Sequence, residues 1–182
     1  MSNSQVYKKK VSNEKKFKII MWGAFFTIFF FALTIPDKPS NIWLFSKVYA
    51  AGMFFGGVGG YAKISEYPLA FIFSYGGAFW LGWTSSVVIY FIYVGNKEVR
   101  EKVYSMDQKS RLICLVAFFA VFNLACWPHE EGERVFWMFS MMAKSRIMLG
   151  IFSGGVYFIN LLASLGFIFV FEYYVRRYLW RR

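Results

Sequence analysis

Five long apolar segments, separated by short polar links, constrain this chain more than any other feature of its sequence. They cover residues 17–35, 42–62, 69–95, 112–127 and 147–171. A helix needs about 20 mostly apolar residues to cross the hydrocarbon core of a bilayer. Hydrophobic residues make up 58% of the 182 positions, whereas soluble domains contain roughly 45–50% apolar residues. The sequence therefore predicts an all-α integral membrane protein.

The first apolar segment follows a polar, basic stretch. A cleavable signal peptide would have a shorter apolar region, followed by small residues at a cleavage site. We therefore expect an uncleaved first helix. The predicted organisation is a basic N-terminal segment at residues 1–16, one polytopic helical domain at 17–175, and a basic tail at 176–182.

The chain is strongly basic, with 21 Lys and Arg against 10 Asp and Glu and a net charge of +11. In a soluble protein this balance would indicate nucleic acid binding. Here the cations lie at the ends of apolar segments, where they orient membrane helices. We interpret the charge as a signal for orientation and for contact with anionic lipid headgroups, and we expect no nucleic acid partner.

The distribution of cations favours four crossings over five. If residues 42–62 do not span, fifteen of the 21 cations fall on one side: six up to Lys18, five in 96–111 and four from Arg176 onward. Six fall on the other side. Five crossings, with Lys47 set aside, would divide the cations 10 to 10. Because Lys and Arg are enriched in cytoplasmic loops, we predict that both termini lie in the cytoplasm, in a bacterial inner membrane.

The remaining apolar segment, residues 42–62, is then predicted to be an additional glycine-rich helix embedded in the membrane. Partial crossings are tolerated only where protein covers them, and the short link to residues 69–95 makes that segment the expected partner. A further apolar stretch at 135–142 is too short to span, and we expect it to lie flat at the outer surface.

The glycine-rich run GMFFGGVGG lies in the embedded segment and is predicted to be a packing face. Glycines recur there every four residues, which leaves a groove without side chains along one side of a helix. Small residues recur at the same spacing in residues 69–95, with Ser86 continuing the series, and two glycines lie in 147–171. Such stripes let helix backbones approach closely in lipid. The predicted helix-packing residues are Gly52, Gly56, Gly60, Ala70, Ser74, Ala78, Gly82, Gly150 and Gly154.

A phosphate-binding loop is the main alternative for the glycine-rich run. A dinucleotide fingerprint needs a preceding strand, and a P-loop needs Gly-Lys followed by Ser or Thr. The run lies in an apolar, helical stretch and is not followed by such a lysine. We expect neither site, and no cofactor.

Polar residues inside a membrane are candidates for function, and here they are Lys47, Asn123 and Asn160. Lys47 is expected to snorkel to the outer headgroups, with a buried pair to Glu66 as the alternative. The two asparagines lie at different depths, so each is expected to bond a hydroxyl or the backbone of another helix.

The single histidine, His129, stands beside Glu130, Glu131 and Glu133 in the loop sequence PHEEGE. One imidazole and three carboxylates could bind a metal or respond to pH. Because they are neighbours in a loop with no second histidine, we interpret them as a solvated acidic loop and predict no metal site. No sequence motif for catalysis is present, so we predict that the protein is not an enzyme.

Two functions then remain open. The favoured one is contact between helices of this protein and another integral membrane protein or complex, as in immunity, entry-exclusion or assembly factors, or with a second copy of itself. The alternative is a small transporter or channel subunit formed by oligomerisation, with the paired glycines Gly76 and Gly77 as a hinge.

Overall fold

The computed structural model describes residues 3–36, 46–47, 50, 54, 56–126 and 137–179. Every regular element in these ranges is helical, which confirms the predicted all-α fold class. In chain order the elements are α1 (Asn3–Thr34), α3 (Gly56–Lys63), α4 (Pro68–Phe71), the π-helical turn η1 (Ile72–Gly76), α5 (Gly77–Tyr93), α6 (Lys97–Ser105), α7 (Gln108–Cys126), α8 (Trp137–Lys144) and α9 (Arg146–Leu179).

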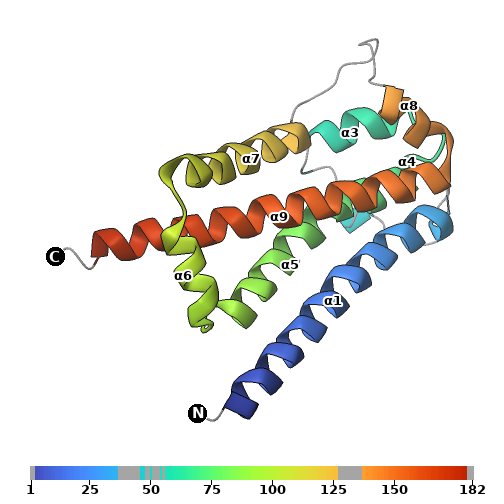
Figure 1. Ribbon diagram of the computed structural model, residues 1–182. Coiled ribbons are helices and arrows are strands. Elements are labelled where there is room, and N and C mark those ends of the chain that lie inside the picture. The colour runs from blue at the N-terminus through green and yellow to red at the C-terminus, as the bar shows by residue number, and fades with distance from the viewer. Residues whose placement is uncertain are drawn as a thin grey trace.

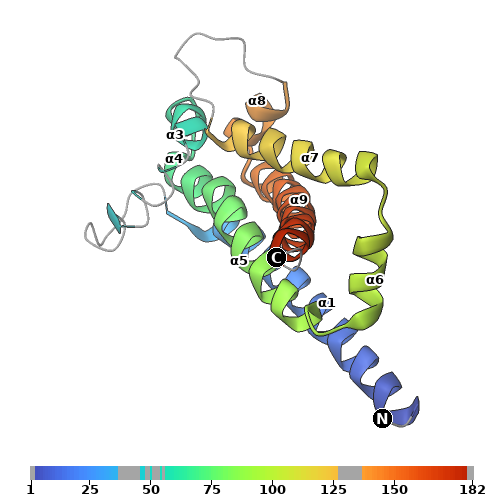
Figure 2. The ribbon, with the colours of Figure 1, turned by 90° about the vertical axis from the view of Figure 1, so that its left-hand side faces the viewer.

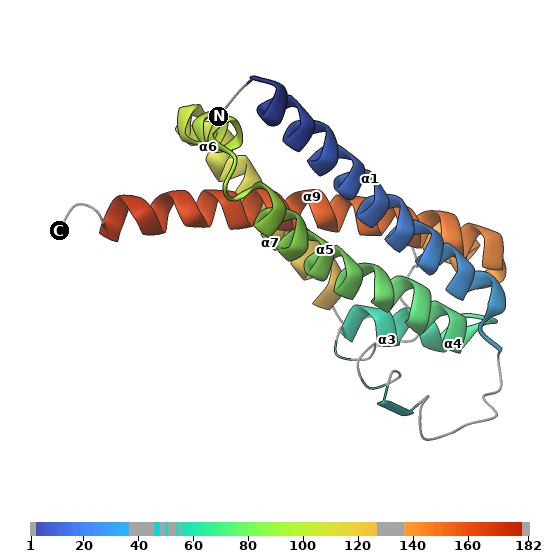
Figure 3. The ribbon, with the colours of Figure 1, turned by 90° about the horizontal axis from the view of Figure 1, so that it is seen from below.

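The longest helix, α9, runs through the whole bundle and contacts α1, α5, α6, α7 and α8. Figure 2 shows it between α5, α7 and α1. In Figure 1, α1 begins, α5 ends and α9 ends on the side where α6 lies. We call this side the basic end. At the opposite side, which we call the Arg146 end, α1 and α9 converge (Figures 1 and 3).

By length and composition, two helices in the described residues can cross a membrane. They are Ser12–Thr34, within α1, and α9. The helix from Pro68 to Tyr93, taken together with α6, makes a third candidate, and the two parts meet at a bend of 111°. Two or three candidate spans support a membrane location, while the four predicted crossings go beyond this number.

Of the embedded helix predicted at residues 42–62, the structure describes residues 46–47, 50, 54 and 56–62. Residues 46–47 and 50 are helical, and the longest helix described in this segment is α3, which begins at Gly56 after a turn at Phe54. Contacts join α3 to α4 and η1, at the start of the predicted partner segment, and also to α7 and α8. The packing surface of this region is therefore broader than the single partner expected from the sequence.

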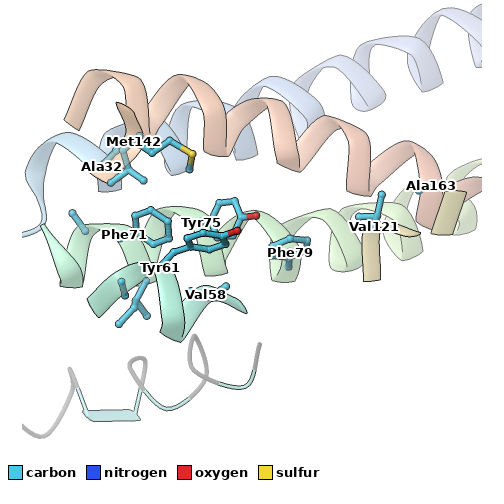
Figure 4. Close-up of a cluster of buried hydrophobic side chains, with 13 residues drawn as sticks. Ala32, Val58, Tyr61, Phe71, Tyr75, Phe79, Val121, Met142 and Ala163 are labelled. Atoms are coloured by element: carbon cyan, nitrogen blue, oxygen red, sulfur yellow. The ribbon is translucent and has the colours of Figure 1, made fainter. Parts of the chain in front are cut away.

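A cluster of buried aromatic and aliphatic side chains fills the space between α3, η1, α8 and α9 near the Arg146 end (Figure 4). Tyr61 of α3 stacks on Phe139 of α8 with ring centroids 3.9 Å apart and planes 4° apart. Tyr75 of η1 meets Phe139 edge to face at 5.8 Å. Met142 of α8 is fully buried, so the short apolar stretch after the acidic loop forms a helix that packs on the bundle.

The π turn η1 helps to keep one face of the segment from Pro68 to Tyr93 aligned. A spacing of four residues overshoots an α-helical turn of about 3.6 residues, so a stripe at this spacing drifts around the helix. A π turn, with bonds from residue i to i+5, holds more residues and offsets part of the drift. The small residues of this stripe are all buried: Ala70, Ser74, Ala78, Gly82 and Ser86.

Two glycines of α9 accommodate aromatic rings from α1. A Cβ atom added at Gly150 would lie 2.7 Å from Cδ2 of Phe29, and one added at Gly154 would overlap the ring of Phe25. The phenyl rings of Phe25 and Phe29 stack on each other, with centroids 6.4 Å apart. At these two positions the helices therefore meet through phenyl rings of α1 that pack against glycines of α9.

The adjacent glycines Gly154 and Gly155 provide a matched test of this packing. We expect Gly154→Leu to lower the free energy of unfolding in detergent by about 1–3 kcal/mol, the usual cost of overpacking. Nothing lies within 4 Å of a Cβ at Gly155, so Gly155→Leu makes the same change of residue without the clash. Equal melting temperatures for the two variants would contradict the packing of the Phe25 ring of α1 against Gly154 of α9.

Candidate functional site

The most deeply placed polar contact in the described bundle joins α9 to α5. The side-chain Nδ2 of Asn160 donates to the carbonyl oxygen of Phe79 at 2.9 Å, and both residues are buried. The hydroxyl of Ser164 donates to Oδ1 of Asn160 at 3.2 Å. A Cβ at Gly82 would overlap the Asn160 amide. Gly82 therefore makes room for the hydrogen bond that links the two helices.

Asn160 is one of four buried polar residues on the same face of α9. Ser153, Tyr157, Asn160 and Ser164 are spaced by four, three and four residues, which places them on one side of a helix. The hydroxyl oxygens of Ser153 and of Ser74, in η1, are buried without a hydrogen-bond partner among the described residues. The interior of the bundle thus has a polar face whose hydrogen-bonding capacity is only partly used.

Arg146, the first residue of α9, binds the end of α1. Its Nη1 lies 2.7 Å from the carbonyl oxygen of Ile35, 3.2 Å from that of Leu33 and 3.4 Å from that of Ala32. The last carbonyls of a helix have no partner within the helix and carry partial negative charge. The guanidinium also lies over the ring of Tyr67, at 4.6 Å. One side chain therefore joins α1, α9 and the start of α4.

At the basic end, Glu172 connects α6 to α9. The carboxylate lies 2.7 Å from Nε of Arg176, one turn along α9, and 3.8 Å from Nε of Arg100 in α6. Only 10% of the Glu172 side chain is exposed. Because a buried carboxylate needs a compensating charge, the two guanidinium groups hold Glu172 in place and dock α6 against α9.

A second contact at this end involves the start of α7. Asp107 caps α7 by accepting from the backbone N–H of Ser110 at 3.2 Å, and hydrogen bonds from Ser110 hold the pKa of Asp107 below its usual value. The guanidinium of Arg111 stacks 3.7 Å from the ring centroid of Tyr173, and its Nη2 donates to the carbonyl of Tyr104 at 2.9 Å. Arg111 is 8% exposed, so it serves as a structural link between α6, α7 and α9.

Among the described residues, α1 has a more exposed surface than α9, the other single-helix candidate span. Only 11% of its apolar window is buried, against 33% for α9. Exposed large side chains recur there at spacings of three and four residues, namely Ile19, Trp22, Phe26, Phe30 and Leu33. Thr27 is also exposed, its hydroxyl bonded to the carbonyl of Gly23 at 2.8 Å, and nothing lies within 4 Å of a Cβ at Gly23.

The structure brings together most of the described small residues that the sequence singled out. The stripe from Ala70 to Gly82 is buried, and Gly150 and Gly154 lie beneath the rings of α1. Gly60 of α3 is half-buried. Gly52 lies outside the described residues, and Gly56 is described only as the first residue of α3.

The predicted polar residues differ in their contacts. Asn160 bonds the backbone of another helix, as expected. The expectation for Asn123 is wrong, because its Nδ2 donates to the carbonyl of Phe119 in its own helix at 2.8 Å. The Asn123 side chain is exposed, so its nearest acceptor is the carbonyl one turn earlier. Lys47 and Glu66 are both exposed, and the structure gives no ion pair between them.

The predicted acidic loop around His129, with Glu130, Glu131 and Glu133, lies outside the described residues. Within the described ranges, no three His, Cys, Asp or Glu side chains come together in a way that could hold a metal ion.

Sequence reasoning missed the structural roles of Arg146, Arg111 and Glu172, which it counted only as charges. Each lies at the edge of an apolar segment, where a cation is normally read as a topology signal. The polar spacing on α9 was visible in the sequence.

Comparison of the chain with known proteins gives no match to a family model, to a curated protein or to a solved structure. The function must therefore be argued from the residues and their contacts alone.

The two asparagines allow a test of the buried link between α5 and α9. We expect Asn160→Ala to lower the free energy of unfolding by about 1–2 kcal/mol, from a lost interhelical bond and a small cavity. Asn123→Ala should change it by no more than about 0.5 kcal/mol, as for a typical exposed site. Denaturant titration in detergent micelles measures both values, and a larger loss for Asn123→Ala would contradict the assignment.

Proposed function

We propose that this chain is a four-crossing membrane protein that acts by binding another integral membrane protein through the free face of α1. The observation that carries the proposal is the pattern on this face, where an open Gly23 and an exposed Thr27, four residues apart, lie beside large aromatic side chains. Small residues spaced by four let a second helix approach closely in lipid, where packing drives association.

The hydrogen bonds of the polar side chains in the bundle support a role in binding another protein over a catalytic role. Asn160, Ser164 and Arg146 all bond groups of the protein's own helices. The described ion pairs lie within α6, within α9 or between these two helices, at the basic end. The proposed role requires no catalytic centre and no cofactor.

The proposed topology places both termini and residues 96–111 in the cytoplasm of a bacterial inner membrane. The helix from Pro68 to Tyr93 rises about 1.5 Å per residue and is long enough for about 30 Å of hydrocarbon. The bend of 111° at its end is consistent with α6 lying along the surface, near anionic headgroups. α7, with 19 residues, would supply the fourth crossing.

A second candidate function is a small channel or transporter subunit formed by oligomerisation. The buried hydroxyls of Ser74 and Ser153, which have no hydrogen-bond partner in the part of the chain that the structure describes, favour it. The π turn η1 favours it too, since such turns are frequent at functional sites. This candidate ranks second because the Asp, Glu, Lys and Arg side chains described in the bundle lie near its two ends.

Labelling of a cysteine in α6 tests the topology. The side chain of Lys97 is 91% exposed, so Lys97→Cys should be reactive once the membrane is permeable. In intact cells, with Cys114 and Cys126 replaced, we expect an impermeant thiol reagent added outside to leave it unlabelled. Rapid labelling in intact cells would contradict the proposed orientation.

Purification from native membranes in mild detergent tests the proposed contact face. We expect one foreign membrane protein to copurify in stoichiometric amount with the unmodified chain, and to be lost with Gly23→Leu. Gly155→Leu on α9 is the control and should keep the partner. Because Gly23 and Gly155 both have open space around them, neither substitution should impair folding. A clean homo-oligomer, or equal capture by both variants, would contradict the proposal; the first result would direct attention to flux measurements in liposomes.

A further inference from the structure

Arg111, near the start of α7, is a buried cation whose described contacts are with neutral groups. Only 8% of the residue is exposed, and its Nε has no hydrogen-bond partner among the described residues. The guanidinium carbon lies 3.7 Å from the centroid of the Tyr173 ring, and Nη2 donates to the carbonyl of Tyr104. Because a buried charge is costly unless an opposite charge compensates it, Arg111 needs an anion that these contacts do not supply.

The nearest carboxylate in the sequence, that of Asp107, does not fill this role. It accepts a hydrogen bond from the backbone N–H of Ser110 at 3.2 Å, as the cap of α7. In the described residues no ion pair joins Asp107 to Arg111. The counter-charge must therefore come from elsewhere.

The hydroxyl of Tyr173 lies on the open side of this site. It accepts a hydrogen bond from Nη1 of Arg177 at 3.1 Å, in a contact that is exposed to solvent. A phenol that accepts a hydrogen bond still has its own proton to donate, and a guanidinium has five N–H donors. Tyr173 and Arg177 can therefore both donate to oxygen atoms of one ligand beside Arg111.

The neighbouring charges leave this end of the bundle positive. Two guanidinium groups, those of Arg100 and Arg176, share the carboxylate of Glu172. In the part of the chain that the structure describes, no ion pair reaches Arg111 or Arg177. Four guanidinium groups therefore gather around two adjacent positions of α9, against one carboxylate.

The site lies at the depth of lipid headgroups for a protein whose α9 crosses the membrane. The candidate span of α9 ends at Leu179, and the rings of Tyr173 and Tyr174 meet near this end, with centroids 5.3 Å apart. Tyrosines at the end of a span are typical of the membrane interface. Leu112, next to Arg111, is 59% exposed and offers an apolar surface to acyl chains.

We propose that Arg111, Tyr173 and Arg177 bind the phosphate group of an anionic membrane phospholipid. Tyr173 and Arg177 donate hydrogen bonds to the phosphate oxygens, which are strong acceptors for guanidinium groups. The negative charge of the phosphate compensates the buried guanidinium of Arg111. This inference rests on α9 crossing the membrane, as in the proposed topology, and not on the contact face around Gly23.

The charges of the site argue against other ligands. The ammonium group of a zwitterionic headgroup would meet guanidinium groups, and the carboxylate of Glu172 is already shared by two of them. The same charges repel metal ions, and no group of three potential metal ligands occurs in the described residues. Soluble phosphate would make the same polar contacts but none with the apolar surface at Leu112, so the lipid is favoured.

Titration of the purified full-length chain with phospholipids of matched acyl chains tests this proposal. Native mass spectrometry compares the binding of phosphatidylglycerol with that of phosphatidylcholine. We expect phosphatidylglycerol to bind about tenfold more tightly, the size of a hydrogen bond to a charged group. Arg177→Gln should abolish this preference, and its melting temperature should stay unchanged because the side chain is exposed.

Lys102→Gln is the matched control. Lys102 is an exposed cation of α6 at the same end of the bundle, so its replacement changes the net charge equally and should keep the preference. Equal binding of the two lipids, a preference that survives in Arg177→Gln, or an equal loss in both variants would overturn the proposal.

Added inorganic phosphate distinguishes the source of the anion. We expect it not to compete with phosphatidylglycerol, because it lacks the apolar contact. Competition would assign the site to free phosphate and overturn the lipid assignment. Since these measurements do not involve the Gly23 face, their failure and that of the proposed partner contact are distinguishable.

Discussion

The close approach of neighbouring helices to α9 is the constraint on which the bundle depends. Lipid tails are as apolar as the side chains they contact, so burial of apolar area does little to join helices in a bilayer. Association must then come from complementary surfaces and from polar bonds between helices. On α9, Gly150 and Gly154 accommodate rings of α1, while Asn160 bonds α5 through the space left by Gly82. Each contact requires a residue without a side chain.

The ends of the helices are held by another kind of interaction. At the Arg146 end one guanidinium binds two carbonyls of α1 and that of Ile35, just after the helix, and at the basic end Glu172 pairs with Arg100 and Arg176. Charged groups are costly in hydrocarbon but inexpensive near headgroups. The protein therefore has polar links of high charge at its two ends and neutral amide and hydroxyl links between them.

The fold class and the packing stripes could be predicted from the sequence because both depend on local spacing. The length of apolar segments indicates helices, and small residues at intervals of four indicate a face, as the buried stripe through Ala70 and Gly82 illustrates. The partner of each face could not be predicted. Asn123 and Asn160 look alike in the sequence, yet only Asn160 faces another helix. The same limit applies to Arg146, whose acceptors lie more than a hundred positions away.

The hold of Arg146 on α1 also has a consequence for the order of assembly during synthesis. Ile35 and Arg146 are 111 residues apart, and at roughly 5–20 residues per second that stretch takes about 6–22 seconds to translate. Throughout this interval the carbonyls at the end of α1 lack their guanidinium partner. The contact that joins the first helix to the last can therefore form only after nearly all of the chain before α9 has been synthesised.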